Sequence, residues 1–494
     1  MASLDLNNAF FLISINKHCR KYLRFSWDNQ IFEFNVLPFG LSTAPYVFTK
    51  LLKPVMSILR SLGYLSTIYL DDVCCIAPTY RECAMNIQHT RTLFESLGFL
   101  INEEKSSLIP SNRCTYLGFI IDSNRFYICL PDIKRNNIIS ELRKLSRLQR
   151  CSIRYFARIV GLLTAACPGI QYGWLYTKQL ERCKYLALLQ SEDNYDSLMC
   201  VPNYIQNDIQ WWIKSVKNSF NPIREDIYTL EIFSDASKTG WGVVCGGKTA
   251  SGQWSIDEAQ KHINYLELMA AFFGLKIFAS NSYDCQILLR IDNTTAISYI
   301  NHMGGIRFPH LNRLTKDIWI FCENRNIFIY ASYISSKDNN LADAESRRLH
   351  PDTEWELTNL AFKHIVDNFG KPEVDLFASR LNAKCNKYVS WHRDPGAYTV
   401  NAFTINWNSL DFYAFPPVSV ITKVLRKIIT DRAEGILVVP YWPTQAWFPL
   451  FNRLLLSAAI ILEPVDKMLT LSSCSVTTLP QLKLMAGKLS GKHS

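Results

Sequence analysis

Residues 66–77 read Ser-Thr-Ile-Tyr-Leu-Asp-Asp-Val-Cys-Cys-Ile-Ala, two apolar runs on either side of the acidic pair Asp71 and Asp72. Short runs rich in Ile, Val, Tyr and Thr predict strands, and the polar pair between them predicts a tight hairpin. Taken alone, adjacent acids at a hairpin tip are more often a solvated turn than a functional site. The neighbouring sequence has to decide between these two interpretations.

Four further blocks accompany the hairpin in a fixed order. They are Ser3–Phe10, Leu37–Pro45, Leu97–Lys105 and Thr115–Phe119. The first block places Asp5 on another apolar strand, the second is a turn that leads into a helix over residues 46–59, and the last predicts a hairpin. Carboxylates that converge from separate strands are suitable ligands for two Mg²⁺ ions, the arrangement that phosphoryl transfer requires.

In this order the blocks resemble motifs A to E of reverse transcriptases, and Tyr69–Asp72 matches the family motif Tyr-x-Asp-Asp. The resemblance implies an α+β palm of the polymerase type with a helical thumb and connection, and RNA-directed DNA polymerase activity. It also implies that Asp5 and Asp71 are the principal metal ligands and that Asp72 is a third, less essential carboxylate. Each active site would hold two Mg²⁺ (or Mn²⁺) ions.

The same resemblance implies contacts with nucleotide and template at Phe10, Phe39, Gly40, Tyr69 and Lys105. Phe10 matches the aromatic residue that stacks under the incoming sugar and leaves no room for a 2′-hydroxyl; a core aromatic is the alternative. Phe39 and Gly40 match the turn under the templating base pair. Lys105 matches the lysine that protonates pyrophosphate, and a solvated surface lysine is the equal alternative.

One departure concerns the fingers subdomain, which the family carries upstream of the first motif. Only four residues precede Asp5, and a hairpin formed by Lys21–Phe25 and Ile31–Asn35 is the one candidate for the fingers. We therefore expect an N-terminally truncated chain with poor polymerase activity. The alternative is a truncated remnant that binds nucleic acid without polymerase activity.

A second set of acids lies between residues 228 and 350. It consists of Asp235, Glu267, Asp292 and Asp343. The order of predicted strands and helices resembles the α/β fold of ribonuclease H, and these acids match its four metal-ligating positions. The resemblance implies two-metal hydrolysis of the RNA strand of an RNA–DNA hybrid, with the 2′-hydroxyl marking RNA. The loop Tyr333–Ser336 lacks the histidine of related elements, which predicts slower turnover.

Two blocks, Val374–Arg380 and Phe412–Pro417, carry a third resemblance. A region of this kind after ribonuclease H is similar to DIRS-type retrotransposons, whose corresponding α/β domain resembles Dam adenine methyltransferases. Active relatives have a polar residue before Pro-Pro, whereas Phe415 and Val418 flank the pair here. We expect a degenerate domain without methyl transfer, serving as a nucleic-acid or structural module. A pararetroviral origin is the weaker alternative.

The expected domains are a palm over 1–130, a thumb and connection over 131–225, a ribonuclease H-like domain over 228–350, a methyltransferase-like domain over 356–480, and a frayed basic tail over 481–494. The 494 residues carry a net charge of +10, which suits a polyanionic partner. The implied partners are RNA template, DNA primer, RNA–DNA hybrid and deoxynucleoside triphosphates. The 15 cysteines show no zinc spacing, and no signal peptide or membrane span is evident. We expect an intracellular protein with buried thiols.

Overall fold

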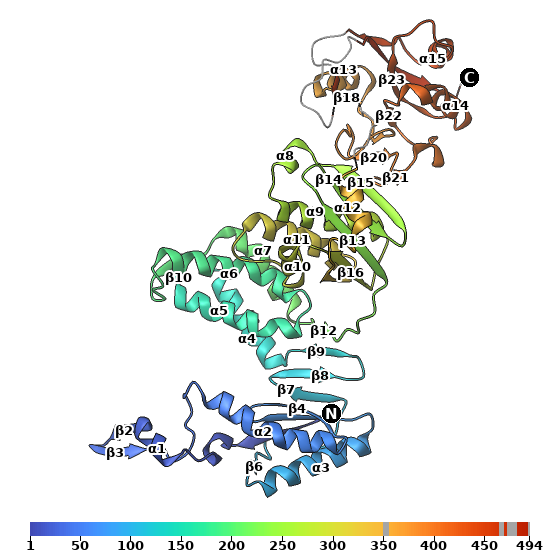
Figure 1. Cartoon of the computed structure of the whole chain (residues 1–494). Helices are drawn as coiled ribbons and strands as arrows, with labels where there is room; N and C mark the ends of the chain where they lie inside the picture. The colour runs from blue at the N-terminus through green and yellow to red at the C-terminus, as the bar shows by residue number, and fades with distance from the viewer. Residues whose placement is uncertain (349–354, 464–468, 472–481, 493–494) are drawn as a thin grey trace. The chain divides into compact units, whose positions relative to one another are not determined.

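The computed structural model describes the whole chain except residues 349–354, 464–468, 472–481 and 493–494 (Figure 1). The chain forms two compact units, Met1–Asp226 and Ile227–Ser494. The division falls where the sequence predicts the end of the thumb and connection. Among the described residues, no helix has the length and apolar character needed to cross a membrane. The described cysteines are free thiols, and most of them are buried.

The first unit begins with an antiparallel sheet in the order β4-β5-β1-β6. Its strands are β1 (Ala2–Asn7), β4 (Leu65–Tyr69), β5 (Asp72–Ile76) and β6 (Leu100–Ile101), and its helices are α2 (Ala44–Ser61) and α3 (Tyr80–Ser96). Alternate residues Ala2, Leu4 and Leu6 are at most 1% exposed, because a strand turns every second side chain to the same face. They join the apolar side of α2, including Phe48 and Leu52, in one core. The predicted helix over residues 46–59 is confirmed, with slightly wider bounds.

The predicted fingers hairpin exists, but its bounds were wrong. Its strands are β2 (Arg24–Trp27) and β3 (Gln30–Glu33), and the preceding residues form the short helical turns α1 (Lys17–Arg20) and η2 (Lys21–Leu23). Asp28 and Asn29 form the turn with φ of 48° and 58°, the left-handed values that a two-residue hairpin loop requires. The Asp-Asn pair therefore determines the register, which the apolar run alone did not reveal.

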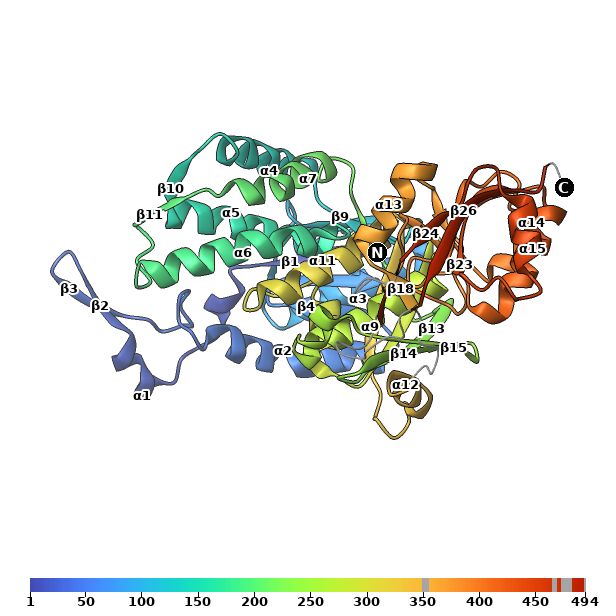
Figure 2. The same cartoon turned by 90° about the horizontal axis from the view of Figure 1, so that it is seen from above.

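A second antiparallel sheet and a helical bundle complete this unit. The sheet runs β12-β9-β8-β7, with β7 (Arg113–Tyr116), β8 (Phe119–Asp122), β9 (Tyr127–Cys129) and β12 (Asn221–Pro222), and a small ribbon pairs β10 (Arg150–Ser152) with β11 (Leu198–Cys200). The helices are α4 (Asp132–Leu145), α5 (Ile153–Ala166), α6 (Gly173–Gln190) and α7 (Gln206–Ser215). Figures 1 and 2 both show α5 and α6 side by side. Phe156, Leu180 and Trp212 are completely buried between the helices.

Two arginines of the bundle have partners within the chain. The guanidinium group of Arg135 donates to the carbonyl oxygens of Leu130, Val216 and Lys217. Val216 and Lys217 directly follow α7, where carbonyl oxygens have no partner within the helix, and Arg135 supplies one. Arg154 likewise pairs with Asp196 at 2.8 Å.

The second unit opens with a mixed sheet in the order β15-β14-β13-β16-β17. Its strands are β13 (Leu230–Ala236), β14 (Gly240–Cys245), β15 (Lys248–Gln253), β16 (Cys285–Ile291) and β17 (Ile327–Tyr333). Its helices are α8 (Ile256–Ala259), α9 (Ile263–Phe278), α10 (Thr294–Asn301), α11 (Pro309–Glu323) and α12 (Asn340–Ser346). Strands β13 to β15 are antiparallel, whereas β13, β16 and β17 are parallel. Strand β15 was not predicted, because Lys-Thr-Ala-Ser-Gly-Gln lacks an apolar run.

Beyond residue 354, the described residues form a seven-stranded sheet in the order β21-β20-β19-β22-β23-β26-β24. Its strands are β19 (Val374–Asp375), β20 (Lys387–Ser390), β21 (Thr399–Val400), β22 (Phe412–Ala414), β23 (Glu434–Pro440), β24 (Ile460–Leu462) and β26 (Leu484–Ser490), and a ribbon pairs β18 (Trp355–Leu357) with β25 (Leu469–Leu471). The strands from β21 to β23 are parallel, and β26 is antiparallel to both of its neighbours. The helices are α13 (Asn359–Phe369), α14 (Ile421–Thr430) and α15 (Phe448–Leu454).

The predicted frayed tail over 481–494 was wrong. Leu484–Ser490 is the strand β26, paired along its length with Glu434–Pro440. The segment is short and contains Gly487 and Lys488, so its composition suggested a tail, but its backbone fills the place beside β23. Figure 2 shows β23 and β26 between α13 on one side and α14 with α15 on the other.

Candidate active sites

The three acids predicted in the palm lie at one end of its two central strands, β1 and β5. Asp5 on β1 lies directly opposite Asp72 on the antiparallel strand β5. The backbone N–H of Leu6 donates to the carbonyl oxygen of Asp71 at 3.0 Å, which holds the hairpin tip beside the same strand. Cross-strand partners have Cβ atoms about 4.5–5.5 Å apart, so the carboxylates of Asp5 and Asp72 are within reach of a shared ion.

The electrostatics at this end of β1 and β5 favour a bound cation. Burial raises the pKa of Asp72, and the neighbouring charges of Asp71 and Asp5 raise it further, while Lys105 lowers it. Clustered carboxylates repel one another, and a divalent cation removes that repulsion. The charge of Lys105 thus acts on Asp72, and its contact with a leaving pyrophosphate stays a prediction.

Of the remaining palm residues named from the sequence, Phe10 follows β1, Phe39 and Gly40 precede α2, and Tyr69 ends β4. The ring of Phe10 is 8% exposed and stacks on Phe48 at 4.7 Å between ring centroids, with Phe39 at 5.4 Å. One face of the Phe10 ring therefore packs against other aromatic rings, which is what the core-aromatic alternative describes. Phe39 and Tyr69 are 62% and 61% exposed. Gly40 has φ +88°, a conformation that side chains other than glycine rarely adopt.

Three of the four acids predicted in the second unit form a cluster. Asp235 lies on β13, Glu267 on α9 and Asp292 directly after β16, and each offers one carboxylate oxygen within 4.8 Å of the others. Asp235 and Glu267 are only 5% and 4% exposed. The second carboxylate oxygen of Glu267, Oε2, is buried and has no hydrogen-bond partner among the described residues. A buried carboxylate oxygen without a partner is costly, and a hard divalent cation is the ligand that the cluster fits.

Buried charge strongly affects the protonation of this cluster. Burial raises the pKa of Glu267 to about 9, and the charges of Asp235 and Asp292 add to the effect. Burial also raises the pKa of Asp235, whereas the hydrogen bond from Ser346 lowers it. Without a cation, Glu267 therefore holds a proton at neutral pH, which a metal ion must displace.

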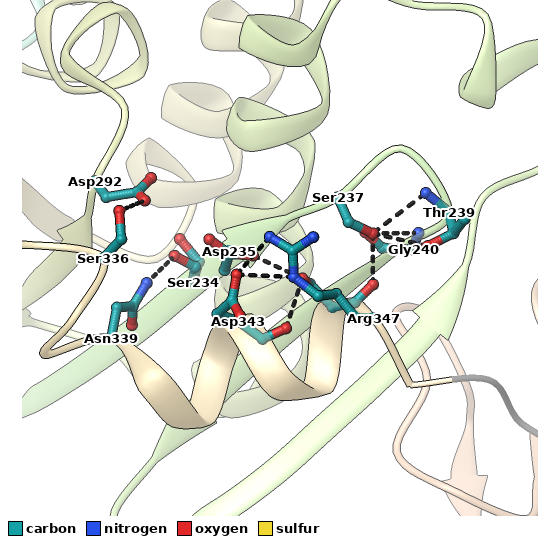
Figure 3. A network of polar contacts seen from close by, with 11 residues as sticks. Ser234, Asp235, Ser237, Thr239, Gly240, Asp292, Ser336, Asn339, Asp343 and Arg347 are labelled. Atoms are coloured by element: carbon teal, nitrogen blue, oxygen red, sulfur yellow. Dashed lines mark hydrogen bonds and ion pairs between the residues drawn. The ribbon is translucent and has the colours of Figure 1, made fainter.

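Two serine hydroxyls that sequence reasoning missed hold the acids in place (Figure 3). Ser346 donates to Oδ2 of Asp235 at 2.6 Å, and Ser336 donates to Oδ2 of Asp292 at 2.7 Å. Ser336 belongs to the loop Tyr333–Ser336, which lacks the histidine of related elements. Ser346 follows Asp343 by three residues on α12, so helical spacing was the signal that places both on one face.

The fourth predicted acid, Asp343, is not part of the cluster. Its Oδ1 accepts two hydrogen bonds from Arg347, from Nε at 3.0 Å and from Nη2 at 2.7 Å. Its charge still contributes to the raised pKa of Asp235, so the two carboxylates are near each other. The structure therefore brings three of the acids into ligand distance and leaves the fourth paired with a guanidinium group.

The blocks singled out beyond residue 354 lie at the carboxyl ends of β19 and β22. Asp375 is 2% exposed and accepts backbone hydrogen bonds from Phe377 at 3.3 Å and Lys384 at 3.1 Å, which close its own loop. Phe415 packs against the core on the α13 side of the sheet. At this point a polar side chain would be needed to bind an amine, and Phe415 provides none.

The raised pKa of Glu267 leads to a testable pH dependence of stability. The folded chain keeps this proton up to about pH 9, whereas the unfolded chain releases it near its ordinary pKa of 4.5. Stability in chelator therefore falls as the pH rises between these values. We expect Glu267→Gln to raise the melting temperature of the second unit by about 5–10 °C at pH 8, and by little near pH 4.5. Calorimetry in chelator measures both values, and equal melting temperatures at pH 8 would show that Glu267 carries no buried proton.

Residues 1–121 match the family model described as Reverse transcriptase (RNA-dependent DNA polymerase). The matched segment contains Asp5, Asp71 and Asp72. This part of the chain is a reverse transcriptase domain.

Curated relatives of the chain are viral polyproteins. The Enzymatic polyprotein of Carnation etched ring virus is 23% identical over 311 residues, covering 61% of this chain and 44% of the relative. Protein P of a Hepatitis B virus of genotype D is 26% identical over 294 residues, covering 56% of this chain and 31% of the relative. The chain thus spans less than half the length of these relatives. Among solved structures, a foamy viral protease-reverse transcriptase in complex with RNA/DNA hybrid is 16% identical with a TM-score of 0.41, covering 73% of this chain and 47% of that one.

Proposed function

We propose that the chain is an RNA-directed DNA polymerase that also degrades the RNA strand of its product hybrid. The observation that carries the polymerase part is that Asp5 lies opposite Asp72, and that the charges of Asp5 and Asp71 both act on Asp72, within the segment that matches the reverse transcriptase family. Two Mg²⁺ or Mn²⁺ ions bound there supply activation of the primer 3′-hydroxyl and charge stabilisation of the triphosphate. The substrates are an RNA template, a DNA primer and deoxynucleoside triphosphates.

The other palm residues have roles that follow from their positions. Lys105 lies near the acids and can give a proton to the leaving pyrophosphate. Phe10, which stacks on Phe48, would lie under the incoming sugar and leave no space for a 2′-hydroxyl. Phe39 and Gly40 would lie under the templating base pair, and exposed Tyr69 is the first residue of the Tyr-x-Asp-Asp motif.

Ribonuclease H activity is the second part of the proposal, and two observations favour it. Asp235, Glu267 and Asp292 lie within ligand distance of one another, and in the described part of the chain Oε2 of Glu267 has no hydrogen-bond partner. Bound Mg²⁺ or Mn²⁺ ions supply activation of water for attack on the RNA strand. Ser346 and Ser336 keep the carboxylates of Asp235 and Asp292 oriented towards the ions.

The part of the chain beyond residue 354 completes the proposal as a degenerate methyltransferase-like domain of a DIRS-like element. Its parallel strands with an antiparallel β26 support the fold, and Phe415 argues against catalysis. We expect no transfer of labelled methyl groups from S-adenosylmethionine to DNA. Incorporation that disappears in Pro416→Ala would contradict this expectation.

The experiment that tests the proposal is extension of a labelled DNA primer on an RNA template by the full chain. Deoxynucleotide incorporation that requires Mg²⁺ or Mn²⁺ and stops with chelator is the expected result. Binding of the primed template without incorporation in either metal would favour the remnant interpretation instead.

A further inference from the structure

The ion pair between Asp343 and Arg347 lies beside the three-acid cluster, on the same helix α12 as Ser346. Both side chains remain accessible, with 37% of Asp343 and 65% of Arg347 exposed. Figure 3 shows the guanidinium group reaching back along the helix to the carboxylate. The charges of Asp343 and of Arg347 also act on Asp235, in opposite directions, so the guanidinium group lies within electrostatic reach of the cluster.

The backbone of α12 is fixed on the sheet. Gly242 is the residue directly opposite Asp235 on β14, and a Cβ added to it would lie 2.2 Å from the carbonyl oxygen of Ala342. The backbone of α12 therefore packs directly against the backbone of β14 at Gly242. Ser237 adds a hydrogen bond to the carbonyl oxygen of Ser346 at 2.6 Å. With the backbone held at these points, Asp343 can approach the cluster only by changing its side-chain rotamer and releasing Arg347.

The two parts of the site thus differ in whether their carboxylates already lie at ligand distance for a cation. Asp235, Glu267 and Asp292 already lie within ligand distance, while Oδ1 of Asp343 accepts two hydrogen bonds from a positive group. We propose that Arg347 is a positioning residue that takes the place of the second divalent ion at Asp343, so that the second ion binds weakly and only after this guanidinium has moved away. This inference rests on the proposed ribonuclease H function of the cluster.

The size of the effect follows from the exposure of the pair. Exposed ion pairs are weak, so Arg347 hinders the second ion without preventing its binding. Removing the guanidinium removes both the competing hydrogen bonds and the repulsion between two positive groups. We expect Arg347→Gln to lower the Mn²⁺ concentration needed for half-occupancy of the second ion by about 3- to 10-fold.

The experiment measures free Mn²⁺ by paramagnetic resonance during titration of the full chain without nucleic acid. Any ions held in the palm are common to all variants and cancel in the comparison. The matched control is Arg348→Gln, which removes the same charge from the next residue, whose partner is Glu345 at 3.3 Å. We expect Arg348→Gln to leave the titration unchanged, and Asp343→Asn combined with Arg347→Gln to lose the gain.

The outcomes separate this inference from the function on which it rests. Loss of one bound ion in Glu267→Gln together with no change in Arg347→Gln would overturn the role of Arg347 alone. No change in Glu267→Gln would refute the metal site itself. A purely structural role for Arg347 predicts a lower melting temperature in chelator without a change in Mn²⁺ affinity, and that result would also overturn the inference.

Discussion

Asp71→Asn is expected to lower primer extension by about 1,000-fold or more while RNA-strand cleavage continues at the wild-type rate. The substitution keeps the size of the side chain and removes one of the negative charges at the end of β1 and β5. A metal ion contributes several kcal/mol of charge stabilisation to phosphoryl transfer, and about 1.4 kcal/mol corresponds to a tenfold rate change. Single-turnover extension of a labelled primer measures the loss.

The matched control for this prediction is Asp196→Asn. Asp196 belongs to the same unit, has 74% of its side chain exposed, and pairs with Arg154 at 2.8 Å. Exposed pairs of this kind contribute little, so extension by this variant should equal that of the wild type. Extension by Asp71→Asn at the rate of Asp196→Asn would refute the assignment of the palm acids.

Asp292→Asn is expected to show the reverse pattern, with RNA-strand cleavage reduced by about 1,000-fold and primer extension retained. The variant removes one of three charges that lie within 4.8 Å of one another, so the remaining acids cannot hold the cation correctly. Ser336 can still donate to the amide oxygen, so folding should be unaffected. Binding of the hybrid should persist and weaken with salt, because phosphate contacts are electrostatic.

Asp284→Asn provides the control for this second prediction. Asp284 precedes β16, at the end of the strand opposite to Asp292, and its Oδ1 accepts a hydrogen bond from Asn326 at 2.8 Å. Its φ of 51° suits asparagine equally well. Equal cleavage by Asp292→Asn and Asp284→Asn would mean that the acid cluster does not perform the hydrolysis.

Local sequence signals were sufficient for much of the first unit. The hairpin around Asp71 follows from two apolar runs and a polar turn, and the helix α2 follows from apolar residues at helical spacing. The acids of both sites could be named because the blocks that carry them resemble the motifs of reverse transcriptases and ribonuclease H. Such features depend on neighbours in the chain and are visible in the sequence.

Features that depend on distant parts of the chain were not predictable in this way. Strand β26 lies beside β23 although almost fifty residues separate them, and nothing in Leu484–Ser490 identifies that partner. The bonds from Arg135 to backbone carbonyls and from Ser346 to Asp235 join residues far apart in the sequence. The pairing of Asp343 with Arg347 depends on the choice of one rotamer over another, which spacing alone does not determine.

The most direct test of the whole account is one reaction that contains a labelled DNA primer and a differently labelled RNA template. The account predicts that the wild-type chain lengthens the primer and shortens the template, that Asp71→Asn loses only the first activity, and that Asp292→Asn loses only the second. Simultaneous loss of both activities in either variant, or a lengthened primer with Asp71→Asn, would contradict the assignment of two separate metal-dependent sites.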